Sequence, residues 1–416
     1  MHPHRSTRQA SAHTPLSCLL LAAASTLAHA GVTETTLAPP PAAEPWIVPT
    51  IDIRARYEFA DAAGLDPSHA FTLRERLGLK TAAWNGFSAF IEGEFSQAAI
   101  DDYHGGALGA SPFDPANTAI FDPETNELNQ LYLQYAGYES VVKIGRQRLI
   151  YDNAAFIGNV GWRQNEQTFD AISFTNQSIQ DLTLNLAYID QVNRIFGSDA
   201  DNQTANRQDV SSEIYLLNTR YTGIRGLTVG GYAYFMKFDE PVVEGWDNQT
   251  YGVTAKGDLL GLTLYGELAY QTDAGPANDT EALYAHFSAT KTLGTHAFTA
   301  GIEFLDAGFQ TPLATVHAFN GFADAFIGQR ITGTHGGLTN PYISHSLPIF
   351  WGMKWTNTLH AFGDNSLSTD RGWEIDSVLV KKFDDQFTAI AKLAHFESED
   401  VLPTTTRFSV ELNYTF

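Results

Sequence analysis

From Ile51 onward, the chain consists of segments of roughly ten residues in which apolar and polar side chains alternate. A period of two is typical of a β-strand whose faces meet different surroundings. The last segment is the clearest, because apolar side chains take every second position from Phe408 to the final residue, Phe416, and polar side chains take the positions between. The pattern predicts an all-β protein whose strands each have one apolar face.

The connections between these segments alternate between short and long. The short ones lie near residues 85–86, 137–138, 176–178, 222–223, 260–261, 293–294 and 384–385. The long ones lie near 61–69, 97–126, 149–166, 191–211, 239–247, 272–280, 307–346, 363–371 and 398–405. Tight turns at one end and extended loops at the other are typical of outer-membrane barrels.

Nine long loops predict nine hairpins and therefore a transmembrane antiparallel β-barrel of 18 strands, with short periplasmic turns and long extracellular loops. About seventeen strands can be marked directly. We therefore expect one further short strand between Asn340 and Phe350, with 16 strands as the alternative. A barrel this wide has a lumen that wall side chains alone do not fill.

Composition separates this barrel from other membrane proteins. The chain has 27 Phe, 17 Tyr and 7 Trp, yet the mean hydropathy is only −0.18 and no long apolar run follows residue 30. A helical membrane protein is therefore excluded. A large soluble β-protein shares the strand pattern, but it does not account for the loop asymmetry.

The N-terminal region predicts export. Arg5 and Arg8 precede an apolar run, and Ala28-His29-Ala30 is a small-x-small cleavage site, so residues 1–30 are expected to be a cleaved signal peptide. Residues 31–49 are rich in proline and are expected to form a periplasmic linker, with the outer-membrane barrel at 50–416. The expected location is the outer membrane of a Gram-negative bacterium.

Cleavage removes the only cysteine and leaves 23 basic against 47 acidic residues, a net charge of −24. The absence of cysteine excludes disulfide frameworks and thiolate metal sites, and we expect no cofactor and no metal. The acidic balance argues against nucleic acid as a partner. The acidic outer loops instead suggest lipopolysaccharide, bridged by divalent cations, beside the membrane lipid itself.

The chain end carries a second expected interaction. An amphipathic last strand with a terminal aromatic at Phe416 resembles the C-terminal signal recognised by the bacterial outer-membrane barrel-assembly machinery. The resemblance implies that this machinery is a partner during folding.

Strand parity selects candidate pore-lining residues, since one face of each strand must be apolar against lipid. It predicts that Arg54 and Arg56 of the first strand point inward, between Asp52 and Glu58. It also places Arg74, Arg76 and Lys80 of the second strand inward, as the strongest basic stripe in the chain. Glutamates of the third strand are expected to pair with these arginines. Glu75 falls on the lipid face, and the pattern does not explain it.

Three further basic residues are candidates for the pore. Lys143 faces the lumen by parity, and Arg163 lies in a polar loop that could contact a sugar carboxylate. Arg146 shares its parity with Ile144, so we expect it near the outer rim. The longest loop, from Ala307 to Ser346, is rich in apolar residues and is expected to fold inward as a constriction, with a short helix at residues 317–326.

Two stretches resemble a known family. Residues 145–149 (GRQRL) with 161–170 (GWRQNEQTFD), and residues 311–324 (TPLATVHAFNGFAD), are similar to the alginate export family of outer-membrane porins. Residues 73–80 and 127–132 resemble weaker patterns of that family. The resemblance implies an eighteen-stranded monomeric pore through which an anionic polysaccharide leaves the cell.

The main hypothesis is therefore an outer-membrane channel for an anionic polysaccharide or its uronate fragments, which needs an electropositive ladder that binds no charge too tightly. An uptake porin for small nutrients is nearly as well supported. An outer-membrane hydrolase is the third alternative, since residues 340–346 hold a histidine and hydroxyls, but no catalytic motif is present and no catalytic residue is expected.

Overall fold

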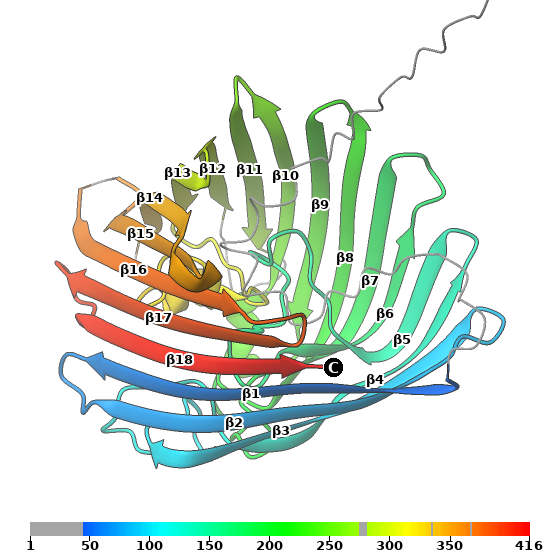
Figure 1. Cartoon of the computed structure of the whole chain (residues 1–416), viewed down its shortest axis with the longest axis horizontal. Helices are drawn as coiled ribbons and strands as arrows, with labels where there is room; N and C mark the ends of the chain where they lie inside the picture. Colours follow the sequence, from blue (N-terminus) through cyan, green and yellow to red (C-terminus); the bar gives the residue numbers. More distant parts are fainter. Residues whose placement is uncertain (1–44, 274–280, 334–335, 367) are drawn as a thin grey trace, which may run out of the picture.

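The computed structural model describes residues 45–273, 281–333, 336–366 and 368–416. The predicted signal peptide and most of the predicted linker lie outside these residues. The described chain is one antiparallel barrel of 18 strands, closed by the pairing of β1 with β18 (Figure 1). The strands are β1 (Ile47–Ala62), β2 (Ser68–Thr81), β3 (Phe87–Asp102), β4 (Thr125–Gly137), β5 (Ser140–Gln147), β6 (Thr168–Asn176), β7 (Leu182–Asn193), β8 (Asp209–Ile224), β9 (Leu227–Phe238), β10 (Asn248–Leu259), β11 (Leu262–Asp273), β12 (Glu281–Leu293), β13 (His296–Leu305), β14 (Leu338–Pro348), β15 (Lys354–Gly363), β16 (Asp370–Lys382), β17 (Phe387–Ser398) and β18 (Thr405–Thr415).

In the part of the chain that the structure describes, helical segments are short and few. They are η2 (Pro241–Trp246), η3 (Val316–Ala318), α1 (Ile327–Thr332) and η4 (Phe350–Gly352). Within the described ranges, no helix has the length and apolar character needed to cross a membrane.

The ends of the barrel differ, as the sequence predicts. At one end, short turns join each even-numbered strand to the next strand, as from β2 to β3 and from β4 to β5, and the C-terminus lies at this end. Long loops occupy the other end (Figure 1). By the convention of outer-membrane barrels the short-turn end is periplasmic. The count of 18 strands is confirmed, and the missing strand is β14, so the alternative count of 16 is wrong.

Several predicted boundaries need correction. β1 begins at Ile47, inside the predicted linker. Pro49 is tolerated there because it pairs only with Leu79 of β2; the C-terminal segment joins β1 from Ile51 onward. The short turn expected at 222–223 lies instead at 225–226, because β8 continues through an irregularity in its register between Tyr221 and Ile224.

The longest loop is also shorter than predicted. β14 begins at Leu338, so the loop between β13 and β14 covers residues 306–337. The predicted helix at 317–326 is wrong: η3 ends at Ala318, and α1 begins only at Ile327. Asn320, Gly321 and Asp324 all have positive φ, a conformation that interrupts a right-handed helix.

The lipid-facing surface follows the strand alternation. Leu73, Leu77 and Leu79 of β2 are exposed on the outer face, while the residues between them are mostly buried. Exposed leucines on every second position suit contact with acyl chains rather than water. Glu75 lies on this outward face, paired in register with Ile53 and Phe95, and the structure gives no account of it.

Three long loops fold into the lumen. They connect β3 to β4 (residues 103–124), β5 to β6 (148–167) and β13 to β14 (306–337), and they are called the inward loops below. Residues 154–169 are all buried, although the barrel has no outer layer to cover them. The barrel wall therefore encloses them, and Figure 1 shows loop segments inside the barrel.

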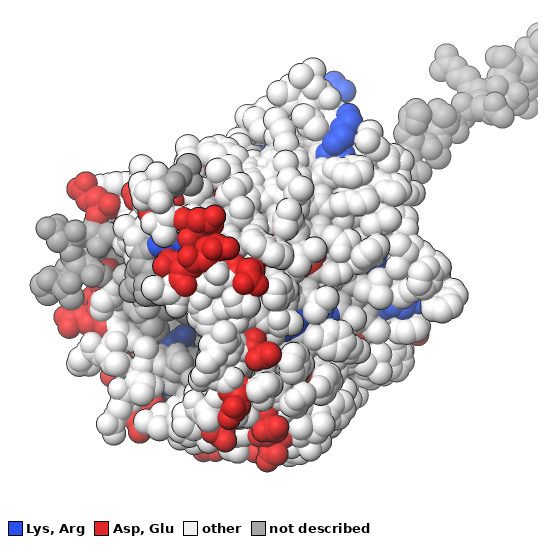
Figure 2. All heavy atoms as spheres, turned by 90° about the vertical axis from the view of Figure 1, so that its left-hand side faces the viewer, with Lys and Arg blue, Asp and Glu red and all other residues white. Residues whose placement is uncertain are grey.

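The outer end of the barrel is acidic. Figure 2 shows acidic side chains gathered on the face that carries the long loops. Exposed acidic residues in and beside these loops include Asp61, Asp66, Asp101, Asp102, Asp114, Asp199, Asp239, Glu244, Glu399 and Asp400. These groups account for much of the negative charge of the chain without placing it in the lumen.

The last residue contributes to barrel closure. Phe416 N–H donates to the Ile51 carbonyl at 2.8 Å, and Ile51 N–H donates to the Phe416 carbonyl at 3.0 Å. Deletion of Phe416 removes both bonds, a loss of about 1–3 kcal/mol, whereas Phe416→Ala keeps them. We expect the deletion to lower the yield of heat-modifiable barrel on refolding into detergent more than Phe416→Ala does. Equal yields would contradict this account.

Candidate functional site in the barrel lumen

One wall of the lumen is lined by cations. Arg54 and Arg56 of β1 and Arg74 and Arg76 of β2 are all buried on the inward face. Lys392 of β17 and Arg407 of β18 extend the same wall, because β17, β18, β1 and β2 are consecutive neighbours in the barrel. These six residues are called the basic wall. They lie between outward positions that face lipid, so the alternation of the strands places them together.

Arg56 shows how the basic wall is neutralised. Its guanidinium lies 2.8 Å from Glu411 of β18 and 3.1 Å from Asp122 of the β3–β4 loop. It also donates to the Trp162 carbonyl and lies 3.8 Å from the centre of the Trp162 ring. A buried cation is stable only with such partners. Here two inward loops supply them.

The neighbouring arginines are bound in the same manner. Arg54 donates to the carbonyls of residues 161–163 at 2.9–3.1 Å. Arg74 pairs with Asp52, and Arg76 forms the expected cross-strand pair with Glu94 of β3. Arg76 also lies 3.7 Å from Glu166 of the β5–β6 loop.

Glu166 fixes the end of the β5–β6 loop. It pairs with Arg148 and accepts hydrogen bonds from Asn129 and Asn159, both at 2.6 Å. Burial by itself raises the pKa of Glu166, but Arg148 and Arg76 outweigh burial and hold the pKa well below its usual value. Glu166 is therefore a charged carboxylate seated between two arginines.

Arg163 joins two inward loops to each other and to the wall. It lies 3.2 Å from Glu58 of β1 and 2.7 Å from Asp324 of the β13–β14 loop. Arg407 shares both carboxylates, at 3.2 Å from Glu58 and 4.0 Å from Asp324. Burial lowers the pKa of Arg163, but its carboxylate partners outweigh this and raise the pKa above its usual value.

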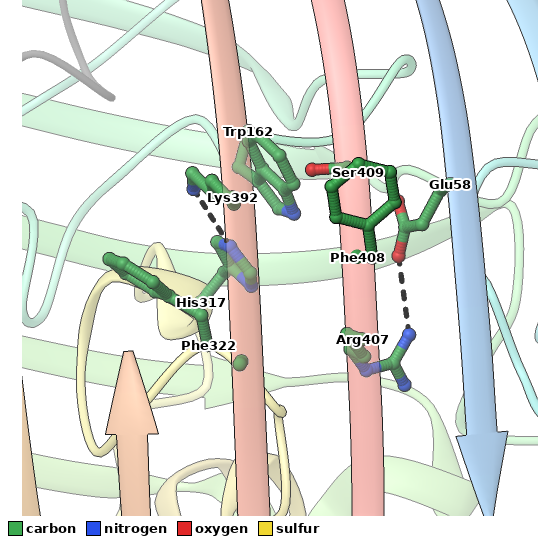
Figure 3. Close-up of a pocket in the computed structure, with 9 residues that line it drawn as sticks. Glu58, Trp162, His317, Phe322, Lys392, Arg407, Phe408 and Ser409 are labelled. Atoms are coloured by element: carbon green, nitrogen blue, oxygen red, sulfur yellow. Dashed lines mark hydrogen bonds and ion pairs between the residues drawn. The ribbon is translucent and has the colours of Figure 1, made fainter. Parts of the chain in front are cut away.

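A cluster around His317 holds the β13–β14 loop against β17. His317 stacks on Trp162 and on Phe322, with ring centres 4.5 Å and 5.1 Å apart (Figure 3). Its Nδ1 donates to Asp324 at 2.7 Å, and its Nε2 accepts from the Lys392 ammonium at 3.0 Å. Lys392 lies 3.4 Å from the centre of the Trp162 ring, a close cation–π contact.

Burial lowers the pKa of His317 to about 4, against the opposing pull of the Asp324 carboxylate. His317 is therefore neutral at neutral pH, which lets Nε2 act as an acceptor for Lys392. Asp324 stays charged, since the hydrogen bond from His317 and the charges of Arg163 and Arg407 hold its pKa below the usual value in spite of burial.

The opposite wall of the lumen is aromatic. Tyr232 and Tyr234 of β9 stack with ring centres 4.8 Å apart, and Tyr284 of β12 continues the surface. Phe156 of the β5–β6 loop lies 5.2 Å from Tyr232 and 5.3 Å from Tyr284. The inward loops thus meet the basic wall through charged contacts, whereas on the opposite side they are held by these aromatic contacts and by the ion pair of Arg330 with Glu303 of β13, at 2.8 Å.

Two predicted pore residues lie apart from the buried network. Lys80 is exposed near the periplasmic end of β2, and Lys143 of β5 is half-buried with its ammonium 4.8 Å from the centre of the Tyr132 ring. Neither has a carboxylate within 4.0 Å in the part of the chain that the structure describes.

Arg146 is not in the lumen. It pairs in register with Leu131, which is exposed on the outward face, and its guanidinium lies 2.7 Å from Asp170. The prediction that Arg146 is a candidate for the pore is therefore wrong. Arg146 has the same parity as Ile144, which points outward, and this parity decides its direction.

Some residues of the network could not be selected from the sequence. Lys392 and Arg407 have inward parity, but Ile390, Ala394 and Phe396 beside Lys392 make that face of β17 look apolar. Asp122, Glu166 and Asp324 lie in loops, where no periodicity assigns direction. Glu166 and Asp324 lie within the two stretches that resemble the family, 161–170 and 311–324, whereas Asp122 lies in neither and carried no signal.

The histidine and serine on which the hydrolase alternative rested, His345 and Ser346, are not brought together in the structure. His345 points outward and lies 3.0 Å from His296, whereas Ser346 points inward and accepts a hydrogen bond from Thr356 at 3.0 Å. Among the described residues, no group of three or more His, Cys, Asp and Glu side chains is placed to hold a metal ion.

The closed barrel with inward loops is the architecture of an outer-membrane porin, and solved structures share it. Over 91% of this chain, Acinetobacter baumannii OccAB4 superposes with a TM-score of 0.67 at 14% identity, and all of that chain is covered. Pseudomonas aeruginosa OpdQ gives 0.66 at 13% identity over 89% of this chain and 98% of its own. The outer membrane protein opdK of Pseudomonas aeruginosa gives 0.66 at 12% identity over 89% and 99%.

The sequence identifies the family. The model of the alginate export family matches residues 46–304, and the chain belongs to that family. No curated protein matches it in sequence. Fold and family together point to a channel of the outer membrane rather than to an enzyme.

Arg163 is expected to hold the inward loops against the wall. Arg163→Gln leaves Glu58 and Asp324 with one guanidinium fewer, and breaking a buried ion pair costs about 3–5 kcal/mol. We expect the inward loops to detach and the mean single-channel conductance to rise several-fold. Arg146→Gln is the matched control, because its outward pair with Asp170 is partly exposed and is worth about 0–1 kcal/mol. The same conductance in both variants would show that Arg163 does not hold the loops.

Acid is expected to loosen the attachment of the β13–β14 loop. The pKa of His317 is below its usual value in the docked loop, so the docked state binds fewer protons and loses stability as the pH falls from about 6.5 to about 4. Asp324 remains charged in this window, and Lys392, Glu58 and Arg163 are the other charges that face the ring. We expect the open fraction in planar bilayers to increase between pH 7 and pH 4.5.

His317→Gln is the control for the acid effect, because an amide can make both hydrogen bonds without titrating. The increase with acid should be absent in this variant. If it persists unchanged, another group controls the loop.

Proposed function

We propose that the protein is a channel through which an anionic polysaccharide, or its uronate fragments, crosses the outer membrane. Membership of the alginate export family supports this cargo class. The observation that carries the proposal is the basic wall, a line of buried guanidinium groups along one side of the lumen, opposite the tyrosines of β9 and β12.

The partners of the basic wall have the chemistry of a polyuronate. Three loop carboxylates, Asp122, Glu166 and Asp324, and the backbone carbonyls of residues 161–163 hold the arginines. A uronate chain also presents carboxylates and hydroxyl groups. Guanidinium groups pair with carboxylates in bidentate geometry, so a sugar carboxylate can take the place of a loop carboxylate without leaving a cation unpaired.

The aromatic wall suits the rest of a sugar chain. Pyranose rings have apolar faces that pack on aromatic rings, and Tyr232, Tyr234 and Tyr284 line the lumen opposite the arginines. A passage with charge on one side and aromatic rings on the other binds an acidic sugar through many weak contacts. Passage requires contacts of this kind, since a single tight site would stop the polymer.

A channel for small solutes is the second candidate. The observation that favours it is the filling of the lumen, because residues 154–169 and most of 309–318 are buried between the walls. Loops in these positions narrow the lumen, and a narrow lumen admits a monomer more easily than a polymer. Under this alternative the basic wall selects small organic anions.

The test is single-channel current through the mature protein in a planar bilayer. We expect anion selectivity, and we expect an alginate tetramer to block the current while a neutral maltose tetramer of equal length does not. Block by monomeric uronate alone would favour the small-solute channel. Cation selectivity, or no block by any uronate, would overturn the proposal.

A further inference from the structure

Two cations at the periplasmic end of the lumen differ from the basic wall. Lys80 lies one residue before the end of β2, and Lys143 lies three residues after the start of β5. Both residues have inward parity, and β2 ends and β5 begins at the end of the barrel where the short turns lie (Figure 1).

The strand register brings the two lysines to one patch. Lys80 is paired with Phe90 of β3, and Phe90 with Tyr132 of β4, so these three residues form one row. Lys143 is paired with Gln134 in the next inward row, and its ammonium lies over the Tyr132 ring at 4.8 Å. Phe90 supports the same ring, with centres 5.6 Å apart.

The two ammonium groups have no counter-charge. Every arginine of the basic wall has a carboxylate within 4.0 Å. Among the described residues, neither Lys80 nor Lys143 has one, and the charges that act on Lys143 are Arg148 and Lys80, which are cations themselves. The patch therefore has an excess of positive charge that an anion would relieve.

We propose that Lys80, Lys143 and Tyr132 form a uronate subsite at the periplasmic mouth of the channel. The two ammonium groups bind one sugar carboxylate, and the Tyr132 ring packs on the face of the same sugar. Gln134 and Ser88, which follow on β4 and β3 in the row of Lys143, supply hydrogen-bonding groups for its hydroxyls. The subsite rests on the proposed function and assigns it a place where the polyanion is first bound.

The charge of the two ends agrees with this placement. The outer loops carry exposed acidic residues that repel a polyanion (Figure 2), whereas the patch attracts one. The subsite lies on strands β2, β4 and β5, so it continues the line of Arg74 and Arg76 toward the periplasm. A chain bound there is already aligned with the basic wall.

The test compares block of the single-channel current by an alginate tetramer added to either side of the bilayer. In the unsubstituted protein we expect stronger block from the periplasmic side. Lys80→Gln/Lys143→Gln should raise the half-blocking concentration on that side about tenfold. Lys354→Gln is the matched control, because Lys354 is also an inward lysine at the periplasmic end of its strand, but lies on β15. It should change the value less than twofold.

The outcomes separate the subsite from the proposed function. If the tetramer blocks the unsubstituted channel and the double variant is blocked equally well, the subsite is wrong and the channel stands. If the tetramer blocks neither the unsubstituted channel nor the double variant, the proposed function is wrong, and the subsite, which rests on it, is wrong with it. Lys80→Arg/Lys143→Arg keeps both charges and should keep the block, and its loss there would also overturn the subsite. Heat-modifiability and unblocked conductance show that each variant is folded.

Discussion

The pairing of wall arginines with loop carboxylates is the interaction on which the interior of this barrel depends. A closed barrel of 18 strands satisfies its own backbone, but it leaves a lumen that its wall cannot fill. Arg56 and Arg163 are buried there only because Glu58, Glu411 and Asp122 surround them. Loops and wall thus depend on each other, since either alone would bury unpaired charge.

This dependence explains which features could be predicted from the sequence. Strand number and the inward direction of Arg54, Arg74 and Lys80 follow from local alternation, because a one-residue shift would place charge against lipid. Gly and Asn at positive φ in the 306–337 loop break a segment whose composition suggested a helix. The loop therefore lies inside, as predicted, but with a different local structure.

The charged network itself could not be predicted, because it joins segments distant in sequence. Arg163 meets Glu58 across 105 positions and Asp324 across 161. A loop has no sequence periodicity from which the wall that a side chain contacts could be predicted. Arg146 shows the converse. Its parity with Ile144 predicts the outward direction correctly, whereas its positive charge suggested a place in the pore that the structure does not give it. Parity is thus the stronger guide wherever a residue lies in a strand.

The two attachments of the inward loops respond differently to an anionic chain. Phe156 and Phe326 hold the loops to Tyr284 and Phe362 by apolar contact, which neither salt nor a carboxylate displaces. The contacts with Arg56 and Arg163 are ionic, and a polyanion competes for them directly. Under the proposed function, a uronate that competes for these ionic contacts would leave the apolar contacts of Phe156 and Phe326 in place.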